Sequence, residues 1–64
     1  MVVVNGKSLD VAGKTLKEYL EMANYNLRTI AVEWNEEIVS GEQYEDIVLQ
    51  DGDIVEVVSF VGGG

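Results

Sequence analysis

The stretch DGDIVEVVSFVGGG, residues 51–64, joins a strand-like segment directly to a run of glycines. Asp51-Gly52-Asp53 is typical of a tight turn, and the β-branched residues after it predict a strand from Ile54 to Phe60. Side chains alternate between the two faces of a strand, so Val55 and Val57 share one face, which we assign to the core. The opposite face then carries Ile54, Glu56, Val58 and Phe60.

Val58 and Phe60 are expected to form an exposed apolar patch beside the glycines. Exposed apolar side chains next to a functional segment are typical of a protein-binding site. We therefore predict that both residues dock a partner. The alternative is that Phe60 packs against a neighbouring strand, because so short a chain buries little surface.

Three glycines, Gly62, Gly63 and Gly64, close the sequence. Glycine lacks a Cβ, so this segment can adopt any backbone conformation and can thread a narrow channel in a partner enzyme. The Gly64 carboxylate is a poor electrophile until it is activated as an acyl adenylate, after which a sulfur or nitrogen nucleophile can attack it. We predict Gly64 as the covalent site and Gly62 and Gly63 as the threading segment. A frayed terminus or an engineered scar is the alternative explanation.

Two earlier segments predict a hairpin and a helix. Val2-Val3-Val4, then Asn5-Gly6, then the alternating Leu9 and Val11 indicate two strands joined by a type I′ turn. Thr15 and Glu18 have the spacing of a capping box, which predicts that a helix of about ten residues begins there. The apolar stripe of this helix is Leu16, Tyr19, Leu20 and Ala23, and its end is expected near residues 24–26, where Asn favours a left-handed cap.

The middle of the chain predicts two further strands. Ile30, Val32 and Trp34 alternate with polar or small residues, a turn follows at Asn35-Glu36, and a short strand is expected around Ile38-Val39. A brief helical turn with Tyr44 pointing inward is expected within residues 41–46. The order is β-β-α-β-β-β, with the helix on one face of a mixed sheet, which is an α+β, β-grasp (ubiquitin-like) arrangement. We expect residues 1–60 to form one domain and residues 61–64 a flexible tail.

Composition excludes several classes of function. The sequence has no histidine and no cysteine, so no base for a serine nucleophile is visible and the common ligands of transition metals are missing. Pairs of carboxylates such as Glu36-Glu37 and Asp51-x-Asp53 are interpreted as solvated surface. Asp51-Gly52-Asp53 lacks the rest of a calcium loop and is therefore read as a turn. We predict no catalytic residues, no metal and no bound cofactor.

The net charge of −8 is unevenly distributed along the chain. All four basic residues precede the segment from Glu33 to Glu56, which holds nine of the twelve acidic residues. Such a surface repels nucleic acids and anionic membranes and attracts a basic protein partner, although the acids can equally serve solubility alone. No apolar run approaches the ~20 residues that a membrane span needs. We expect a cytoplasmic monomer.

The chain resembles the ubiquitin-like sulfur carriers, most closely the ThiS family of thiamine biosynthesis. The resemblance covers nearly the full length and is carried by VNGK at residues 4–7, IAVEWN-x-EIV at 30–39, Tyr44, LQDGDIVEVV at 49–58 and FVGGG at 60–64. A terminal Gly-Gly alone is shared by all ubiquitin-like carriers, whereas its combination with the other segments is specific. The family commonly has a proline after the fourth strand, where this chain has Ser40-Gly41.

The resemblance implies a carrier cycle and a set of partners. An adenylating (E1-like) enzyme would consume ATP to form the Gly64 acyl adenylate, and sulfur from a cysteine-derived donor system would displace AMP to give a thiocarboxylate. Thiazole synthase would then receive the sulfur. The carrier itself would catalyse nothing.

Three alternatives stay open from the sequence. The small subunit of molybdopterin synthase shares the tail and its chemistry, although such chains are usually longer and contain proline. A covalent protein modifier would differ only in the final nucleophile. A non-reactive β-grasp interaction module would make the glycines incidental.

Overall fold

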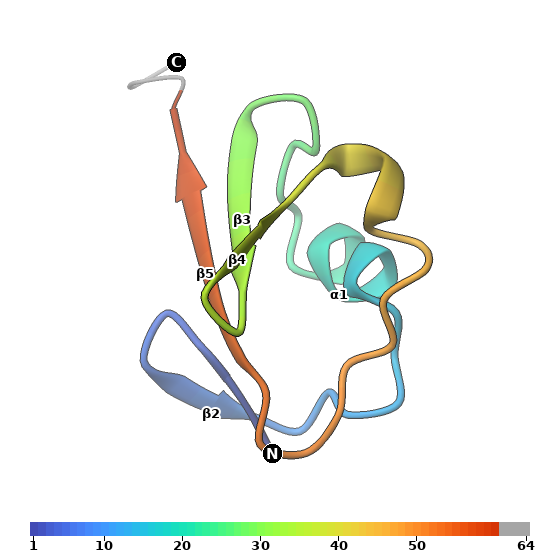
Figure 1. Cartoon of the computed structure of the whole chain (residues 1–64), viewed down its shortest axis with the longest axis vertical. Coiled ribbons are helices and arrows are strands. Elements are labelled where there is room, and N and C mark those ends of the chain that lie inside the picture. Colours follow the sequence, from blue (N-terminus) through green and yellow to red (C-terminus); the bar gives the residue numbers. More distant parts are fainter. Residues whose placement is uncertain (61–64) are drawn as a thin grey trace.

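A computed structural model describes residues 1–60 of the chain, and residues 61–64 lie outside its described part. Within residues 1–60 the chain forms one five-stranded mixed sheet and one α-helix (Figure 1). The elements are β1 (Val2–Val4), β2 (Lys7–Leu9), α1 (Leu16–Met22), β3 (Ile30–Trp34), β4 (Glu37–Val39), the 3₁₀ turn η1 (Gly41–Gln43) and β5 (Ile54–Ser59). The predicted order of elements is confirmed.

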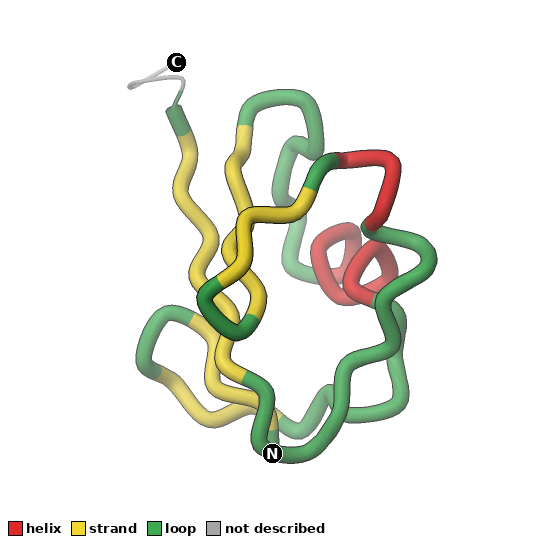
Figure 2. The backbone as a smooth tube through the Cα atoms, viewed as in Figure 1, coloured by secondary structure: helices red, strands yellow, loops and turns green. Residues whose placement is uncertain are grey.

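The last strand lies in the middle of the sheet. The strand order is β2-β1-β5-β3-β4, and Figure 2 shows β5 running between the first hairpin and the second. β5 pairs in parallel with β1, through Val3 opposite Ile54, and antiparallel with the whole of β3. Because β1 is only three residues long, it covers the beginning of β5 and leaves the end of β5 with β3 as its neighbour.

Both hairpin turns need backbone conformations that most residues avoid. Asn5 and Gly6 have φ angles of 50° and 83°, which confirms the type I′ turn predicted from Asn-Gly. Asn35 and Glu36 adopt the same signs, with φ of 50° and 70°. Asn tolerates positive φ readily, whereas Glu does so at a cost, so the second turn depends more on the strands that it joins.

The helix starts as predicted but is shorter than predicted. The Glu18 amide donates to Thr15 Oγ1 (3.1 Å) and the Thr15 amide donates to Glu18 Oε1 (2.7 Å), a complete capping box. α1 then spans seven residues instead of about ten, because Asn24 takes a left-handed φ of 64° and the Tyr25 amide bonds back to the Leu20 carbonyl. The expected asparagine cap is confirmed.

Ala23, which we expected on the buried stripe, is exposed. It occupies the C-cap of α1, where the chain turns away from the sheet. Other boundaries also differ slightly from expectation. The second strand ends at Leu9, so Val11 is buried outside it, and the last strand ends at Ser59, one residue before Phe60.

The core lies between α1 and one face of the sheet. Val55 and Val57 point into it, as predicted, and Tyr44 is an inward anchor next to η1, also as predicted. The buried cluster consists of Val2, Val4, Val11, Leu16, Tyr19, Leu20, Ile30, Val32, Val39, Tyr44, Ile47, Leu49, Val55 and Val57. No helix within residues 1–60 is long and apolar enough to cross a bilayer.

Candidate functional site

The face of the sheet that points away from α1 is uncovered in the described part of the chain. We call it the open face and define it by Ala31, Glu33, Ile38, Ile54, Glu56, Val58 and Phe60, all of which are exposed. Ile38, Val58 and Phe60, three large apolar side chains of this face, are exposed by 81%, 60% and 63%. An exposed apolar surface of this kind is typical of protein-binding sites.

Val58 and Phe60, the predicted docking residues, both lie on the open face. The predicted division of β5 into a buried and an exposed face is therefore confirmed, whereas their role in docking stays a prediction. The Phe60 amide donates to the Thr29 carbonyl (3.0 Å), so the backbone remains attached to the sheet up to this residue. The predicted covalent site, Gly64, and the predicted threading residues, Gly62 and Gly63, lie outside the described residues.

A shallow hollow lies across the centre of the open face. It is lined by Ala31, Val32, Glu33, Ile38, Glu56 and Val58. Glu33 on β3 is paired directly with Glu56 on β5, and it is also paired with Ile38 on β4. The open face is thus apolar at its edges and carries two carboxylates at its centre.

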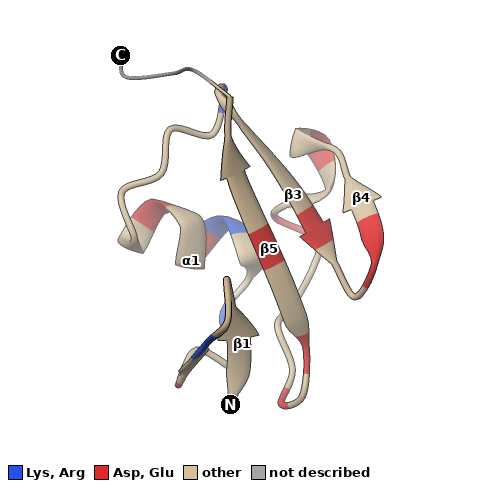
Figure 3. Cartoon of the chain, turned by 90° about the vertical axis from the view of Figure 1, so that its left-hand side faces the viewer, with Lys and Arg blue, Asp and Glu red and all other residues tan. Residues whose placement is uncertain are grey.

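The strands β3, β4 and β5 carry acidic residues and no basic residue. Figure 3 shows acidic positions on β5, β3 and β4, whereas the basic positions lie on other segments. Within residues 1–60 there are two ion pairs, one between the N-terminal ammonium of Met1 and Asp51 and one between Lys17 and Glu45 (4.0 Å). Neither involves a carboxylate of the open face.

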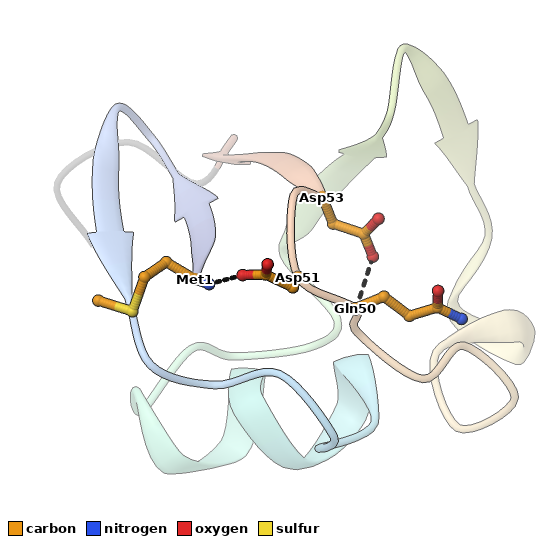
Figure 4. A network of polar contacts seen from close by, with 4 residues as sticks. All are labelled: Met1, Gln50, Asp51 and Asp53. Atoms are coloured by element: carbon orange, nitrogen blue, oxygen red, sulfur yellow. Dashed lines mark hydrogen bonds and ion pairs between the residues drawn. The ribbon is translucent and has the colours of Figure 1, made fainter.

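The beginning of β5 is held by Asp53. Its Oδ2 accepts hydrogen bonds from Trp34 Nε1 (3.0 Å) and the Gln50 amide (2.9 Å), and its Oδ1 accepts one from Asn35 Nδ2 (3.0 Å). Figure 4 shows the contact with Gln50 beside the pairing of Met1 with Asp51. These bonds connect the turn before β5 to the end of β3 and to the turn that joins β3 and β4.

Partial burial of the Asp53 carboxyl raises its pKa, but the hydrogen bonds from Trp34, Asn35 and Gln50 outweigh burial, so the pKa lies below its ordinary value. Asp53 is therefore an ionised structural anchor. This corrects our interpretation of Asp51-x-Asp53 as a solvated pair of carboxylates. The turn itself is confirmed, with Gly52 at a φ of 94°.

Asn5 extends the pairing of β5 beyond the end of β1. Its backbone amide donates to the Val55 carbonyl (2.9 Å), and its side-chain Oδ1 accepts from the Val57 amide (2.8 Å). Its Nδ2 donates to the Val57 carbonyl (3.3 Å). The side chain thus replaces one rung of the ladder at the point where β1 turns away.

The roles of Asp53, Asn5 and the Glu33–Glu56 pair were not predicted from the sequence. Period-2 alternation placed Glu56 on the outer face of β5, and the same alternation in β3 places Glu33 outward. The pattern does not show that the two residues stand opposite each other, since that depends on the register between strands 20 or more residues apart. Among residues 1–60, no three His, Cys, Asp or Glu side chains are grouped as metal ligands.

Known proteins similar to this chain agree on one family. The ThiS family model matches residues 2–64. The chain is 47% identical to sulfur carrier protein ThiS of Thermus thermophilus over 64 residues and 38% identical to sulfur carrier protein ThiS of Bacillus subtilis over 68 residues, with full coverage of both chains in each case. It also matches a thiazole synthase of Paramagnetospirillum magneticum, with 38% identity over 98% of this chain but only 20% of that protein.

The fold has solved counterparts as well. The crystal structure of the thiamine biosynthesis protein ThiS from Geobacter metallireducens superposes with a TM-score of 0.76 at 31% identity, covering 98% of this chain and 97% of that one. The solution structure of a thiamine biosynthesis protein from the same organism gives a TM-score of 0.77. The β-grasp fold and the resemblance noted from the sequence are thereby confirmed, and the chain belongs to the ThiS family.

Proposed function

We propose that this chain is a sulfur carrier of thiamine biosynthesis and that the carboxylate of Gly64 is the group that carries the sulfur. The carrier role is supported by membership of the ThiS family and by full-length relatives that are named as sulfur carriers. The observation that bears most directly on Gly64 is that the family match extends to residue 64 and so includes the three glycines. The chain is a carrier protein on which enzymes act, and not itself a catalyst.

The proposed cycle has two covalent steps at Gly64. First, a carboxylate oxygen attacks the α-phosphorus of ATP, pyrophosphate leaves, and an acyl adenylate forms. A sulfur nucleophile derived from cysteine then attacks the acyl carbon and displaces AMP, which leaves a thiocarboxylate. ATP is consumed in the active site of the adenylating enzyme, so the carrier needs no cofactor of its own.

Thiazole synthase is the proposed acceptor of the sulfur. The match of this chain to one fifth of a thiazole synthase supports a functional link between the carrier domain and that enzyme. The adenylating enzyme and the cysteine-derived sulfur donor are proposed from the chemistry, since a free carboxylate has to be activated before a nucleophile can replace its oxygen.

The open face is proposed to dock the adenylating enzyme, with Val58 and Phe60 as apolar contacts. Both residues lie on the strand that leads into the glycines, so an enzyme bound there is within reach of Gly64. Gly62 and Gly63 are proposed to thread the active site, because residues without a Cβ fit the narrowest channel.

The test is removal of Gly64 alone, with the purified adenylating enzyme, ATP and a cysteine-derived sulfur donor. In the wild-type chain we expect the mass increase that corresponds to replacing one oxygen by sulfur, located on Gly64 by fragmentation. The shortened chain should show none, while its free energy of unfolding should change by no more than about 0.5 kcal/mol.

Gly63 becomes the last residue of the shortened chain, so this variant also tests whether any terminal glycine suffices. Sulfur transfer to the shortened chain, or to a site other than Gly64 in the wild type, would refute the proposal. Transfer of the Gly64 acyl group to a lysine amine, which forms an amide bond, would identify a covalent modifier instead of a sulfur carrier.

A further inference from the structure

We propose that Glu33 and Glu56 together bind one arginine side chain of the adenylating enzyme at the centre of the open face. The inference rests on the proposed function, because it specifies how the enzyme that activates Gly64 recognises this carrier. It concerns residues outside the glycine segment.

The first observation is the register of β3 and β5. Glu33 and Glu56 are directly opposite each other in an antiparallel pair, and both are exposed on the same face. Side chains in such positions lie about 5 Å apart at their Cβ atoms, and like charges there destabilise the sheet. The register therefore places two like charges in facing positions at the middle of the open face.

The second observation is that nothing in the described part of the chain compensates this contact. No ion pair within residues 1–60 involves Glu33 or Glu56. The basic residues lie elsewhere: Lys7 is on β2, Lys14 and Lys17 are at the start of α1, and Arg28 precedes β3. A cation from another molecule would relieve the repulsion between the two carboxylates.

The third observation is the apolar surroundings. Ile38 is paired with Glu33 on one side, and the next row of the sheet pairs Ala31 with Val58. These side chains and the two glutamates line the same shallow hollow. A guanidinium group suits this site better than an ammonium group, because it is planar, binds two carboxylates at once, is weakly hydrated and packs on apolar surface.

The position of the pair near Gly64 and the order of the carrier cycle favour the adenylating enzyme as the partner. Gly64 lies eight residues after Glu56, and eight residues span at most about 29 Å when fully extended. The adenylating enzyme must select the carrier before any sulfur marks Gly64, so its selectivity has to rest on the folded domain. Thiazole synthase, in contrast, can recognise the thiocarboxylate itself.

The experiment compares two double variants that each remove two negative charges. Glu33→Gln with Glu56→Gln removes the facing pair, and Glu21→Gln with Glu42→Gln removes two exposed acids away from the open face. Binding to the purified adenylating enzyme of the same organism is measured by calorimetry without ATP, and thermal unfolding is measured on the free carriers.

We expect the first variant to bind at least about tenfold more weakly than wild type, because it leaves the arginine without its charged partners. Its melting temperature should rise by about 2–6 °C, because the repulsion between the strands is gone. The control variant should bind within about twofold of wild type and gain less stability, since only general charge effects remain. Gain of stability with loss of binding is the signature of the proposal.

The substitution Glu56→Lys supplies the missing cation within the carrier. It should raise the melting temperature further and abolish measurable binding, because the new cation pairs with Glu33 and repels the arginine. Normal binding by this variant would overturn the proposal, as would equal weakening by the two double variants.

Other occupants of the face are separate outcomes. If the first double variant binds the adenylating enzyme normally but slows sulfur transfer from a preformed thiocarboxylate to thiazole synthase, the pair serves the synthase and the proposal is wrong. Self-association of the wild type that is lost in this variant would assign the pair to a second copy of the chain. A wild-type chain that binds the enzyme but is not adenylated contradicts the proposed function alone.

Discussion

At its beginning β5 is held by several partners, whereas at its end it has a single neighbouring strand. Asp53 receives three hydrogen bonds just before the strand, and β1 and β3 flank its first residues. Beyond Val57, where the side chain of Asn5 makes the last contact on the β1 side, the described pairing continues only toward β3. The same strand is thus an anchor at one end and an accessible surface at the other.

This difference suits the proposed role, in which Gly64, the proposed reactive residue, follows the strand. Contacts at the beginning of β5 stabilise the domain without covering the open face. The exposed side chains at its end, Val58 and Phe60, contribute little to the core and remain available for binding. We therefore expect substitutions at the beginning to affect stability and substitutions at the end to affect recognition.

The largest effect on stability is expected from Asp53→Ala. The substitution leaves the half-buried Trp34 indole N–H and the Gln50 amide without their acceptor, and hydrogen bonds to a charged group contribute about 1.5–3 kcal/mol. We expect a loss of about 2–3 kcal/mol in urea unfolding. Asp51→Ala is the control, since it removes only an exposed pairing with the N-terminus, which is worth about 1 kcal/mol or less. Equal losses would contradict the assignment of Asp53 as the anchor.

The pH dependence sharpens this prediction. The pKa of Asp53 is lower in the folded chain than its ordinary value of about 3.9. Its contribution to stability is therefore complete above the unfolded pKa and is lost as the pH falls through the lower folded pKa. As the pH falls below about 5, wild type should lose more stability than Asp53→Asn.

Hydrogen bonds with the backbone and side chain of Thr15 also lower the pKa of Glu18. Glu18 is present in both proteins, so its contribution to the pH dependence cancels when their stabilities are subtracted. Parallel pH profiles of wild type and Asp53→Asn would show that ionisation of Asp53 does not matter for the fold.

An intermediate effect is expected from Asn5→Gly, at the boundary between the two regions. Glycine keeps the left-handed backbone but removes the side-chain bonds to the Val57 amide and carbonyl. We expect a loss of about 1–2 kcal/mol, together with faster hydrogen exchange at the Val57 amide. Asn24→Gly is the matched control, because Asn24 is exposed, has a similar φ of 64° and does not pair with β5. An unchanged exchange rate at Val57 would refute this role of Asn5.

The smallest effect on stability is expected from Phe60→Ala. The side chain is 63% exposed, so we expect a loss below about 1 kcal/mol, compared with about 3–5 kcal/mol for a buried Phe. Binding of the Phe60→Ala variant to the adenylating enzyme should weaken by about 2 kcal/mol or more, as for an interface hot spot. Met22→Ala, an exposed apolar residue on α1, should change neither quantity much. Unfolding by several kcal/mol with normal binding would place Phe60 in the core.

Much of the fold could be predicted because its signals are local. The capping box at Thr15 and Glu18 and the type I′ turn at Asn5-Gly6 each depend on residues within three positions of one another. The alternation in β5 predicted which valines are buried because one face of a strand next to a helix must be covered. The prediction failed at Ala23, where extending the apolar stripe ignored the left-handed Asn24 that ends the helix.

The candidate site was predictable in part. The three glycines are visible directly in the sequence, and their role in carrying sulfur stays a prediction, whereas the exposure of Val58 and Phe60 follows from alternation. The facing pair of Glu33 and Glu56 and the anchoring of Asp53 by Trp34 and Asn35 did not follow, since each joins residues about 20 positions apart.

By itself the sequence determined the order of elements, the inward face of β5 and the glycine segment, because turn chemistry, capping and period-2 alternation act between near neighbours. Only the tertiary structure decided which carboxylate became an anchor and which two face each other on the open face. Strand order and register decide which of these residues become neighbours. Both result from packing the whole sheet against α1 rather than from any local pattern.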